Sequence, residues 1–288
     1  VPFGPGGLAD VTMRLAGEPL GELLGQAVVV ENRPGAGGVA ATSTMLNATP
    51  DGHTLIVLTN GTSIAESQFE LPYNIRTDLQ PVSALAWFDL VLLTSPDSGI
   101  TTVQALLEKA KSAEQGLRIA TINPGSTQNL SAELFKATTG IKATIISYRS
   151  TPDVLGALLR NEVDLVIDAY TALKGAIDGG QAVPVAVTGS MRNAALPQIP
   201  TVVESGVDGY VVEGWNALYT QASVPAAIVA KLNAAINQVV ATADIQSRFT
   251  ELGVEARGST PAEIQQRFES DIASWHKVMV DAGLNTVN

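Results

Sequence analysis

The fold is decided by a pattern that is plainest in residues 117–138, LRIATINPGSTQNLSAELFKAT. Residues 117–121 are short and apolar, as in a buried strand; a polar turn with one glycine follows, and residues 128–138 have the pattern of a helix. The other predicted helices are residues 8–24, 37–47, 101–112, 151–160, 226–241 and 261–282. The other predicted strands are residues 27–31, 54–58, 81–94, 143–148, 164–168 and 183–188, with 211–222 extended. Strands that alternate with helices predict an α/β protein with mainly parallel sheets covered on both faces.

Two extended segments, near residues 95–100 and 211–222, separate this pattern into two series. The length of 288 residues suits two domains of about 100–150 residues each. We therefore expect two lobes, residues 1–98 with 215–288 and residues 99–214, that close by a hinge motion. A ligand cleft is expected between them, where strand ends and helix starts converge.

The composition excludes several classes of protein. The net charge is −11, and the basic residues are scattered singly, so nucleic acid and anionic membrane surfaces are not expected partners. No apolar run approaches the roughly 18–20 residues that span a bilayer, so we expect a soluble protein. The absence of cysteine excludes disulfides, thiol nucleophiles and cysteine metal sites.

Catalytic motifs are scarce. The two histidines lie in a predicted turn and on the last predicted helix, and there is no Gly-x-Ser-x-Gly elbow, nucleotide phosphate loop or metal-ligand spacing. One alternative is an NAD(P)-dependent oxidoreductase, because Gly35-Ala36-Gly37-Gly38-Val39-Ala40 matches the dinucleotide turn Gly-x-Gly-x-x-Ala. Three residues separate the predicted strand from Gly35, whereas in that fingerprint the turn follows the strand directly. The other interpretation is a glycine-rich turn that allows close packing.

Three polar or glycine-rich turns, each placed before a predicted helix, are more informative. They are residues 2–10, 60–63 and 123–129. Glycines let a ligand approach the main-chain amides, and a helix start offers unpaired N–H groups and the positive end of a dipole. Each turn alone could be ordinary helix capping, but the three together favour an anion site with contributions from both lobes.

Two strings near the start, residues 1–10 (VPFGPGGLAD) and 30–38 (VENRPGAGG), closely resemble the opening of the tripartite tricarboxylate transporter receptors, the Bug family. Further matches occur in order at residues 50–55, 161–168, 196–202 and 252–254. The resemblance implies a two-lobed periplasmic binding protein fold of type II (a Venus flytrap) with no enzymatic activity and no cofactor. It also implies a periplasmic receptor that delivers a carboxylate to membrane permease subunits; the signal peptide is not among these residues. The expected ligand is a di- or tricarboxylate, an acidic amino acid or an aromatic carboxylate, and a monomer is expected. A ligand-sensing module of a regulator is a further alternative, since such modules share this fold.

The resemblance also implies where the ligand carboxylate is held: between the first loop and a loop of the second lobe, partly through water. By position, the first-lobe residues are Phe3, Gly6, Gly7 and Leu8, with Thr62 and Ser63 from the adjoining loop. The second-lobe residues are Ser126, Thr127 and Gln128. Arg149 matches a basic position of the family, with solvent exposure as the alternative. Asp168 matches a cleft position, with a helix cap as the alternative. Asn129 stands where many relatives have histidine.

Overall fold

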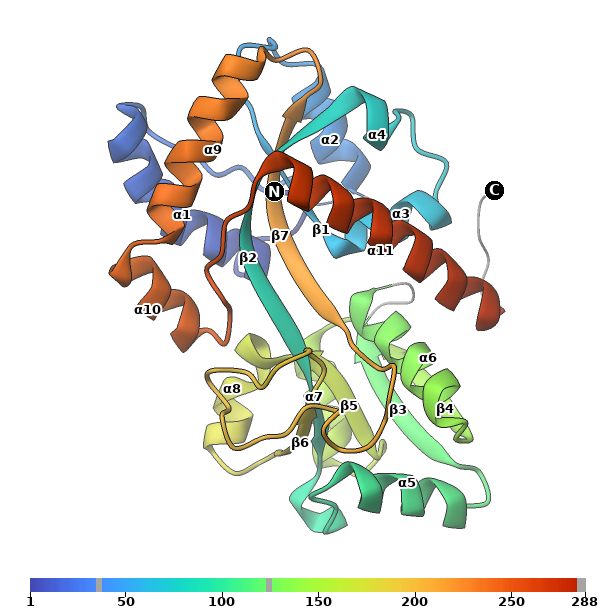
Figure 1. The fold of residues 1–288 in the computed structure, drawn as a ribbon. Helices are drawn as coiled ribbons and strands as arrows, with labels where there is room; N and C mark the ends of the chain where they lie inside the picture. Colours follow the sequence, from blue (N-terminus) through green and yellow to red (C-terminus); the bar gives the residue numbers. More distant parts are fainter. Residues whose placement is uncertain (35–37, 123–125, 284–288) are drawn as a thin grey trace. The chain divides into compact units, whose positions relative to one another are not determined.

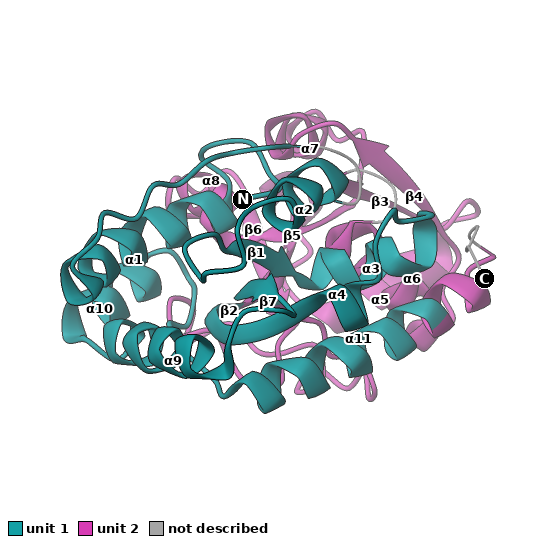
Figure 2. Ribbon diagram, turned by 90° about the horizontal axis from the view of Figure 1, so that it is seen from above, with its two compact units in different colours: residues 1–87, 215–276, 285–288 teal, residues 88–214, 277–284 magenta. Residues whose placement is uncertain are grey.

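The computed structural model describes residues 1–34, 38–122 and 126–283, and these form two compact units (Figures 1 and 2). Unit 1 contains Val1–Trp87 and Trp215–His276, and unit 2 contains Phe88–Gly214 and the end of the last helix from Lys277. The chain leaves unit 1 within strand β2 (Leu79–Thr94) and returns to it within β7 (Glu213–Gln221). The crossing that the sequence predicts near residue 98 lies at the 3₁₀ turn Pro96–Ser98, which follows β2.

Unit 1 is organised around strand β7, which pairs antiparallel with β1 (Ile56–Thr59) so that Ile56 lies opposite Tyr219. Its helices are α1 (Leu8–Leu24), α2 (Val39–Leu46), α3 (Asn60–Gln68), α4 (Ile75–Asp78), α9 (Ala226–Val240), α10 (Ala243–Glu251) and most of α11 (Pro261–Asp281). The side chains of Trp215 and Tyr219 are buried and meet the ring of Phe268 on α11 edge-on, each at 6.1 Å between centroids. These aromatic contacts join β7 to α11 in the core of the unit.

Unit 2 contains the parallel part of the structure. Strand β3 (Leu117–Ile122) pairs in parallel with β4 (Ala143–Tyr148) on one side and with β5 (Leu165–Ala169) on the other. The end of β2 pairs antiparallel with β5 and with β6 (Val183–Val187). The helices are α5 (Val103–Ser112), α6 (Thr127–Thr139), α7 (Thr151–Leu159) and α8 (Tyr170–Asp178), with a 3₁₀ turn at Pro96–Ser98. Because β3, β4 and β5 run in the same direction, their carboxyl ends meet at one edge of the sheet.

Three expectations from the sequence were wrong. The sheet is mixed: of the strand pairs with a described register, only β3–β4 and β3–β5 are parallel, because β2 and β7 each return against their neighbours. Residues 27–31 form no strand although they include three consecutive valines. Residues 60–63 are not a turn but the first turn of α3, which Thr59 caps at the end of β1.

Among the described residues, no single helix is both long and apolar enough to cross a bilayer. Helices α9 and α10 meet the criteria of length and composition only as a pair, across a bend of 68°.

Candidate functional site

The first predicted loop leads directly into α1. Phe3 is 42% exposed, and residues 4–7 are exposed up to the N-cap, Gly7. Gly6 has φ +83°, which glycine adopts without strain. The first N–H groups of α1, beginning with that of Leu8, have no intrahelical partner, and no side chain caps this end of the helix. The loop thus presents main-chain donors at the positive end of a 17-residue helix.

A buried carboxylate, Asp10, fixes this loop. It is 2% exposed and accepts hydrogen bonds from the N–H of Gly6 (2.8 Å), from Nε of Arg14 (3.0 Å) and from Nδ2 of Asn32 (2.8 Å). The same Asn32 amide donates to the carbonyl oxygen of Phe3 at 3.0 Å. Burial acts to raise the pKa of Asp10, but the hydrogen bonds from Arg14, Gly6 and Asn32 lower that pKa to about 2.

This arrangement changes the role of Gly6. Its N–H is already donated to Asp10, so Gly6 supplies the sharp turn of the loop, and the N–H groups of Gly7 and Leu8 are the ones left at the helix start. Neither Asp10 nor Asn32 was among the predicted site residues. The signal in the sequence that points to Asp10 is its position in the first turn of α1.

The second predicted contribution of unit 1, Thr62 and Ser63, lies in the first turn of α3. The Oγ1 atom of Thr62 accepts from the N–H of Thr59 at 3.2 Å and completes a capping box, and Ser63 donates its hydroxyl to the carbonyl oxygen of Asn60 at 2.5 Å. Both side chains are buried, Ser63 completely. In this structure the two hydroxyls therefore hold the start of α3.

In unit 2 the predicted residues collect at the edge where the parallel strands end. Ser126 is the N-cap of α6: its Oγ accepts from the N–H of Asn129 at 3.1 Å and donates to the carbonyl oxygen of Ile122 at 2.7 Å. Thr127 and Gln128 form the first turn of α6 that follows. Asn129 points its side-chain amide at the hydroxyls of Thr121 and Ser147, each 3.4 Å away, and so links α6 to β3 and β4.

Asp168 lies at the end of β5 and contacts another predicted residue directly. Its carboxylate accepts from Nε2 of Gln128 (2.8 Å), from Oγ1 of Thr151 (2.7 Å) and from the N–H of Ala169 (2.7 Å). The side chain is 1% exposed, and this burial raises its pKa in spite of the hydrogen bonds. Asp168 therefore connects the starts of α6 and α7, and Thr151 is a residue that sequence reasoning missed.

Arg149, the remaining predicted residue, lies between β4 and Ser150, the N-cap of α7, and is exposed. Its position at the same strand edge agrees with both of its predicted roles. Two of the sequence interpretations involve residues outside the described ranges: residues 35–37 of the dinucleotide-like turn and residues 123–125 of the third polar turn.

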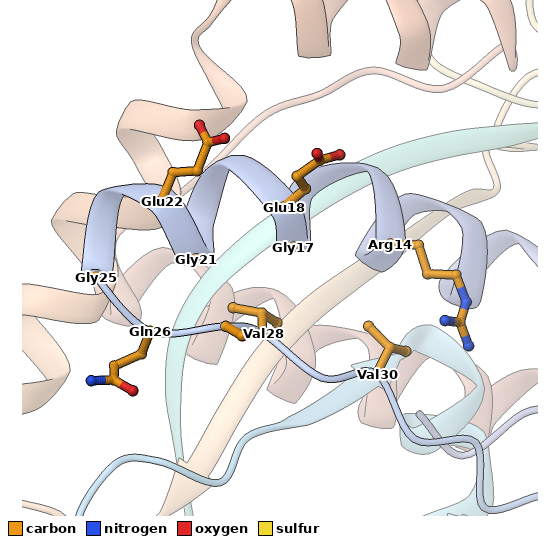
Figure 3. A pocket seen from close by; sticks show the side chains of 10 residues that line it. Arg14, Gly17, Glu18, Gly21, Glu22, Gly25, Gln26, Val28 and Val30 are labelled. Atoms are coloured by element: carbon orange, nitrogen blue, oxygen red, sulfur yellow. The ribbon is translucent and has the colours of Figure 1, made fainter.

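Other features of unit 1 do not add to this site. A cavity of about 660 Å³ follows one side of α1, where Gly17, Gly21 and Gly25 line it together with the segment that carries Val28 and Val30 (Figure 3). It contains none of the predicted site residues. Within the residues that the structure describes, no group of three or more His, Asp or Glu side chains is placed to hold a metal ion.

Comparison with known proteins places these observations in a family. Residues 12–284 match the family described as "Tripartite tricarboxylate transporter family receptor". Protein BugT of Bordetella pertussis is 30% identical over 98% of this chain and 88% of that protein. The solved structure of R. palustris Rpa4515 with adipate is 32% identical, with a TM-score of 0.87 over 99% of this chain and 96% of that one. MatC from Rhodopseudomonas palustris with bound malate is 30% identical, with a TM-score of 0.80 over 96% of each chain.

Proposed function

This chain belongs to the tripartite tricarboxylate transporter receptor family, and on that basis we propose that it captures a small carboxylate in the periplasm and delivers it to a membrane transporter of the tripartite tricarboxylate type. The observation that supports the ligand class best is the uncapped start of α1 behind the clamped glycine loop. Adipate and malate, bound to the two solved relatives, are the first ligands to test. The receptor function of the family makes a dehydrogenase that uses residues 35–40 the less favoured hypothesis.

The proposed binding mechanism uses main-chain donors. One carboxylate oxygen of the ligand accepts from the N–H groups of Gly7 and Leu8, where the α1 dipole favours negative charge. Asp10 and Asn32 hold the loop in place, and Phe3 contacts the rest of the ligand.

Unit 2 is proposed to contribute the start of α6, with Thr127 and Gln128 as contacts and Ser126 as the cap that orients them. Arg149 and Asp168 complete the set, Asp168 by orienting Gln128. Thr62 and Ser63 are proposed to support the adjoining helix start.

The negative net charge of −11 does not oppose this mechanism. The Debye length is about 8 Å at physiological salt, so the dispersed acidic residues repel an incoming anion only weakly. Main-chain dipoles act at contact distance, where the effective dielectric constant is lower. We therefore expect the affinity for adipate or malate to change little between about 50 and 200 mM salt.

The decisive experiment compares Gly7→Val with Arg149→Ala. A Cβ on Gly7 would lie 3.7 Å from the nearest atom, the carbonyl oxygen of Gly4, so Gly7→Val is expected to fold while its side chain blocks access to the loop amides. Titration calorimetry with adipate and malate is expected to show loss of binding in Gly7→Val and a smaller loss in Arg149→Ala. Unfolding temperatures without ligand serve as the control for folding.

Three results would overturn the proposal. Affinity that collapses with salt, together with a larger loss in Arg149→Ala than in Gly7→Val, would show that a side-chain cation holds the anion. If no carboxylate stabilises the wild-type protein, although a ligand at 100 times its Kd contributes about 2.7 kcal/mol, the ligand class is wrong. Recovery of a chemically altered ligand would instead indicate an enzyme.

A further inference from the structure

One polar contact in unit 2 determines which end of a side-chain amide is left for the proposed ligand. Gln128 lies in the first turn of α6, and its Nε2 donates to Oδ1 of Asp168 at 2.8 Å. Asp168 is buried near the end of β5, whereas Gln128 is partly exposed. The contact therefore joins a buried carboxylate to a residue that the proposed function places against the ligand.

The orientation of the Gln128 amide is set by a second donor to the same oxygen. The main-chain N–H of Ala169 also donates to Oδ1 of Asp168, at 2.7 Å, so this oxygen already acts as an acceptor. A carboxyl proton would instead belong to the other oxygen, Oδ2, which lies 2.7 Å from Oγ1 of Thr151. Because an acceptor needs a donor opposite it, Gln128 turns its Nε2 towards Oδ1 whether Asp168 is ionised or protonated.

This orientation leaves the carbonyl end of the amide available. Nε2 and Oε1 of Gln128 diverge from one carbon atom, so with Nε2 on Asp168 the Oε1 atom points away from that carboxylate. Among the residues that the structure describes, no donor makes a hydrogen bond to Oε1 of Gln128. A carbonyl oxygen accepts hydrogen bonds but cannot donate them, so Gln128 offers the ligand an acceptor.

Thr151 adds to this acceptor character. When Asp168 is ionised, the hydroxyl hydrogen of Thr151 is directed at Oδ2, and the lone pairs of Oγ1 remain as acceptors. The charge of Asp168 lies behind both side chains. A second carboxylate placed here would meet acceptors and a negative charge, whereas a hydroxyl or ammonium group would be bound.

We infer that Gln128 selects carboxylates that carry a hydrogen-bond donor, a hydroxyl or an ammonium group, on the carbon chain, and that Asp168 is the positioning residue that orients the Gln128 amide. The inference rests on the proposed function, since it concerns the ligand of the same site. It narrows the ligand class to hydroxy- and amino-substituted carboxylates. An unsubstituted chain would leave Oε1 without a donor once water is displaced, which weakens binding.

Three dicarboxylates of four carbons test the inference in the wild-type protein. Succinate, malate and aspartate share one chain and differ at C2, which carries hydrogen, hydroxyl or ammonium. In titration calorimetry, the better-bound enantiomer of malate is expected to bind about fivefold more tightly than succinate, and that of aspartate about tenfold or more. Equal affinities for the three would overturn the inference and leave the proposed function standing. If none of them binds and adipate does not bind either, the proposed function fails, and this inference fails with it.

A substitution of Gln128 tests whether this residue causes the preference. Gln128→Met removes Oε1 at nearly constant length, so the Kd of succinate divided by that of malate is expected to fall to about one. Gln115→Met, at an exposed glutamine of the same unit, is the matched control and is expected to keep the wild-type ratio. Unfolding temperatures without ligand check that each variant folds. A wild-type ratio in Gln128→Met would overturn the inference.

Two substitutions of Asp168 separate positioning of the amide from general support of the fold. Asp168→Ala leaves the amide of Gln128 free to rotate and present Nε2, so the ratio is expected to fall. Asp168→Asn keeps an oxygen that accepts from Gln128 and from the N–H of Ala169, so it is expected to restore most of the ratio. A loss of stability alone would weaken binding of succinate and malate together and leave their ratio unchanged. A wild-type ratio in Asp168→Ala would overturn the positioning role.

Discussion

The pH dependence of stability offers a sharp test of the structure at Asp89, on β2 in unit 2. This side chain is 7% exposed, and its Oδ1 accepts from Nδ2 of Asn193 at 2.6 Å. Burial, with a smaller contribution from the negative charge of Glu213, raises the pKa of Asp89 from 3.8 to about 6. At 1.36 kcal/mol for each tenfold change, this pKa difference corresponds to about 3 kcal/mol.

The direction in which pH changes the free energy of unfolding follows from proton binding by Asp89 in the folded and unfolded states. Between pH 3.8 and about 6 the folded protein keeps the proton on Asp89, whereas the unfolded chain has released it. The free energy of unfolding therefore contains a contribution that is complete below pH 3.8 and is lost as the pH rises through 6. The pKa of Asp10 is lowered to about 2, so the stabilisation from that group is lost only as the pH falls below 3.8 towards 2, outside this window.

Urea unfolding of the wild type and of Asp89→Asn, from pH 4 to pH 7.5, measures the effect. The free energy of unfolding of the wild type minus that of Asp89→Asn is expected to fall by about 2 kcal/mol across this range, because asparagine cannot titrate and the contribution is already incomplete at pH 4. Asp208→Asn, which removes an exposed carboxylate of the same unit, corrects for the change in net charge. A difference between wild type and Asp89→Asn that stays constant with pH would refute the assigned environment of Asp89.

Two further substitutions test the packing of unit 2. Gly116→Ala is expected to reduce the free energy of unfolding by at least about 2 kcal/mol, because Gly116 has φ +73° and its Cβ would lie 1.9 Å from the carbonyl oxygen of Lys142. Gly175→Ala, whose Cβ meets nothing within 4 Å, is the matched control and is expected to be neutral or stabilising in the same urea assay. Asp164→Ala is expected to cost about 2 kcal/mol at pH 7, because the buried carboxylate of Asp164 accepts from the main chain and the guanidinium of Arg118 at 2.9 and 3.0 Å. A loss below about 0.5 kcal/mol in thermal unfolding would show that this ion pair is not formed in solution.

Local patterns in the sequence were sufficient for the elements that local rules determine. The helix at residues 8–24 and the strand at 143–148 have the predicted bounds, because a glycine turn precedes the helix and a β-branched apolar run fills the strand. The strand predicted at residues 27–31 failed because strand formation needs a partner, which sequence preference alone does not supply. The start of helix α3 was misplaced because its first residues, Asn60 and Gly61, are typical of turns, while the cap that starts the helix is Thr59 at the end of the preceding strand.

In the candidate site, too, some features follow from local sequence patterns and others depend on contacts between distant residues. Sequence reasoning found the helix starts at Gly7 and Ser126, since both follow from turn chemistry. The contact between Gln128 and Asp168 depends on β5 lying beside β3, and that pairing is set by long-range packing rather than by any local signal.

The hydrogen bonds that fix the first loop do not involve the side chain of Phe3. Asp10 and Asn32 hold the loop through the N–H of Gly6 and the carbonyl oxygen of Phe3, atoms that every amino acid possesses. The shape of the loop is therefore independent of the side chain at position 3, which is 42% exposed. If Phe3 contacts the ligand as proposed, substitutions at this position are expected to change ligand selectivity while the backbone proposed to bind the anion keeps its shape. On this proposal, related or engineered proteins can change their ligand selectivity through single substitutions at position 3 without a change in the backbone of the loop.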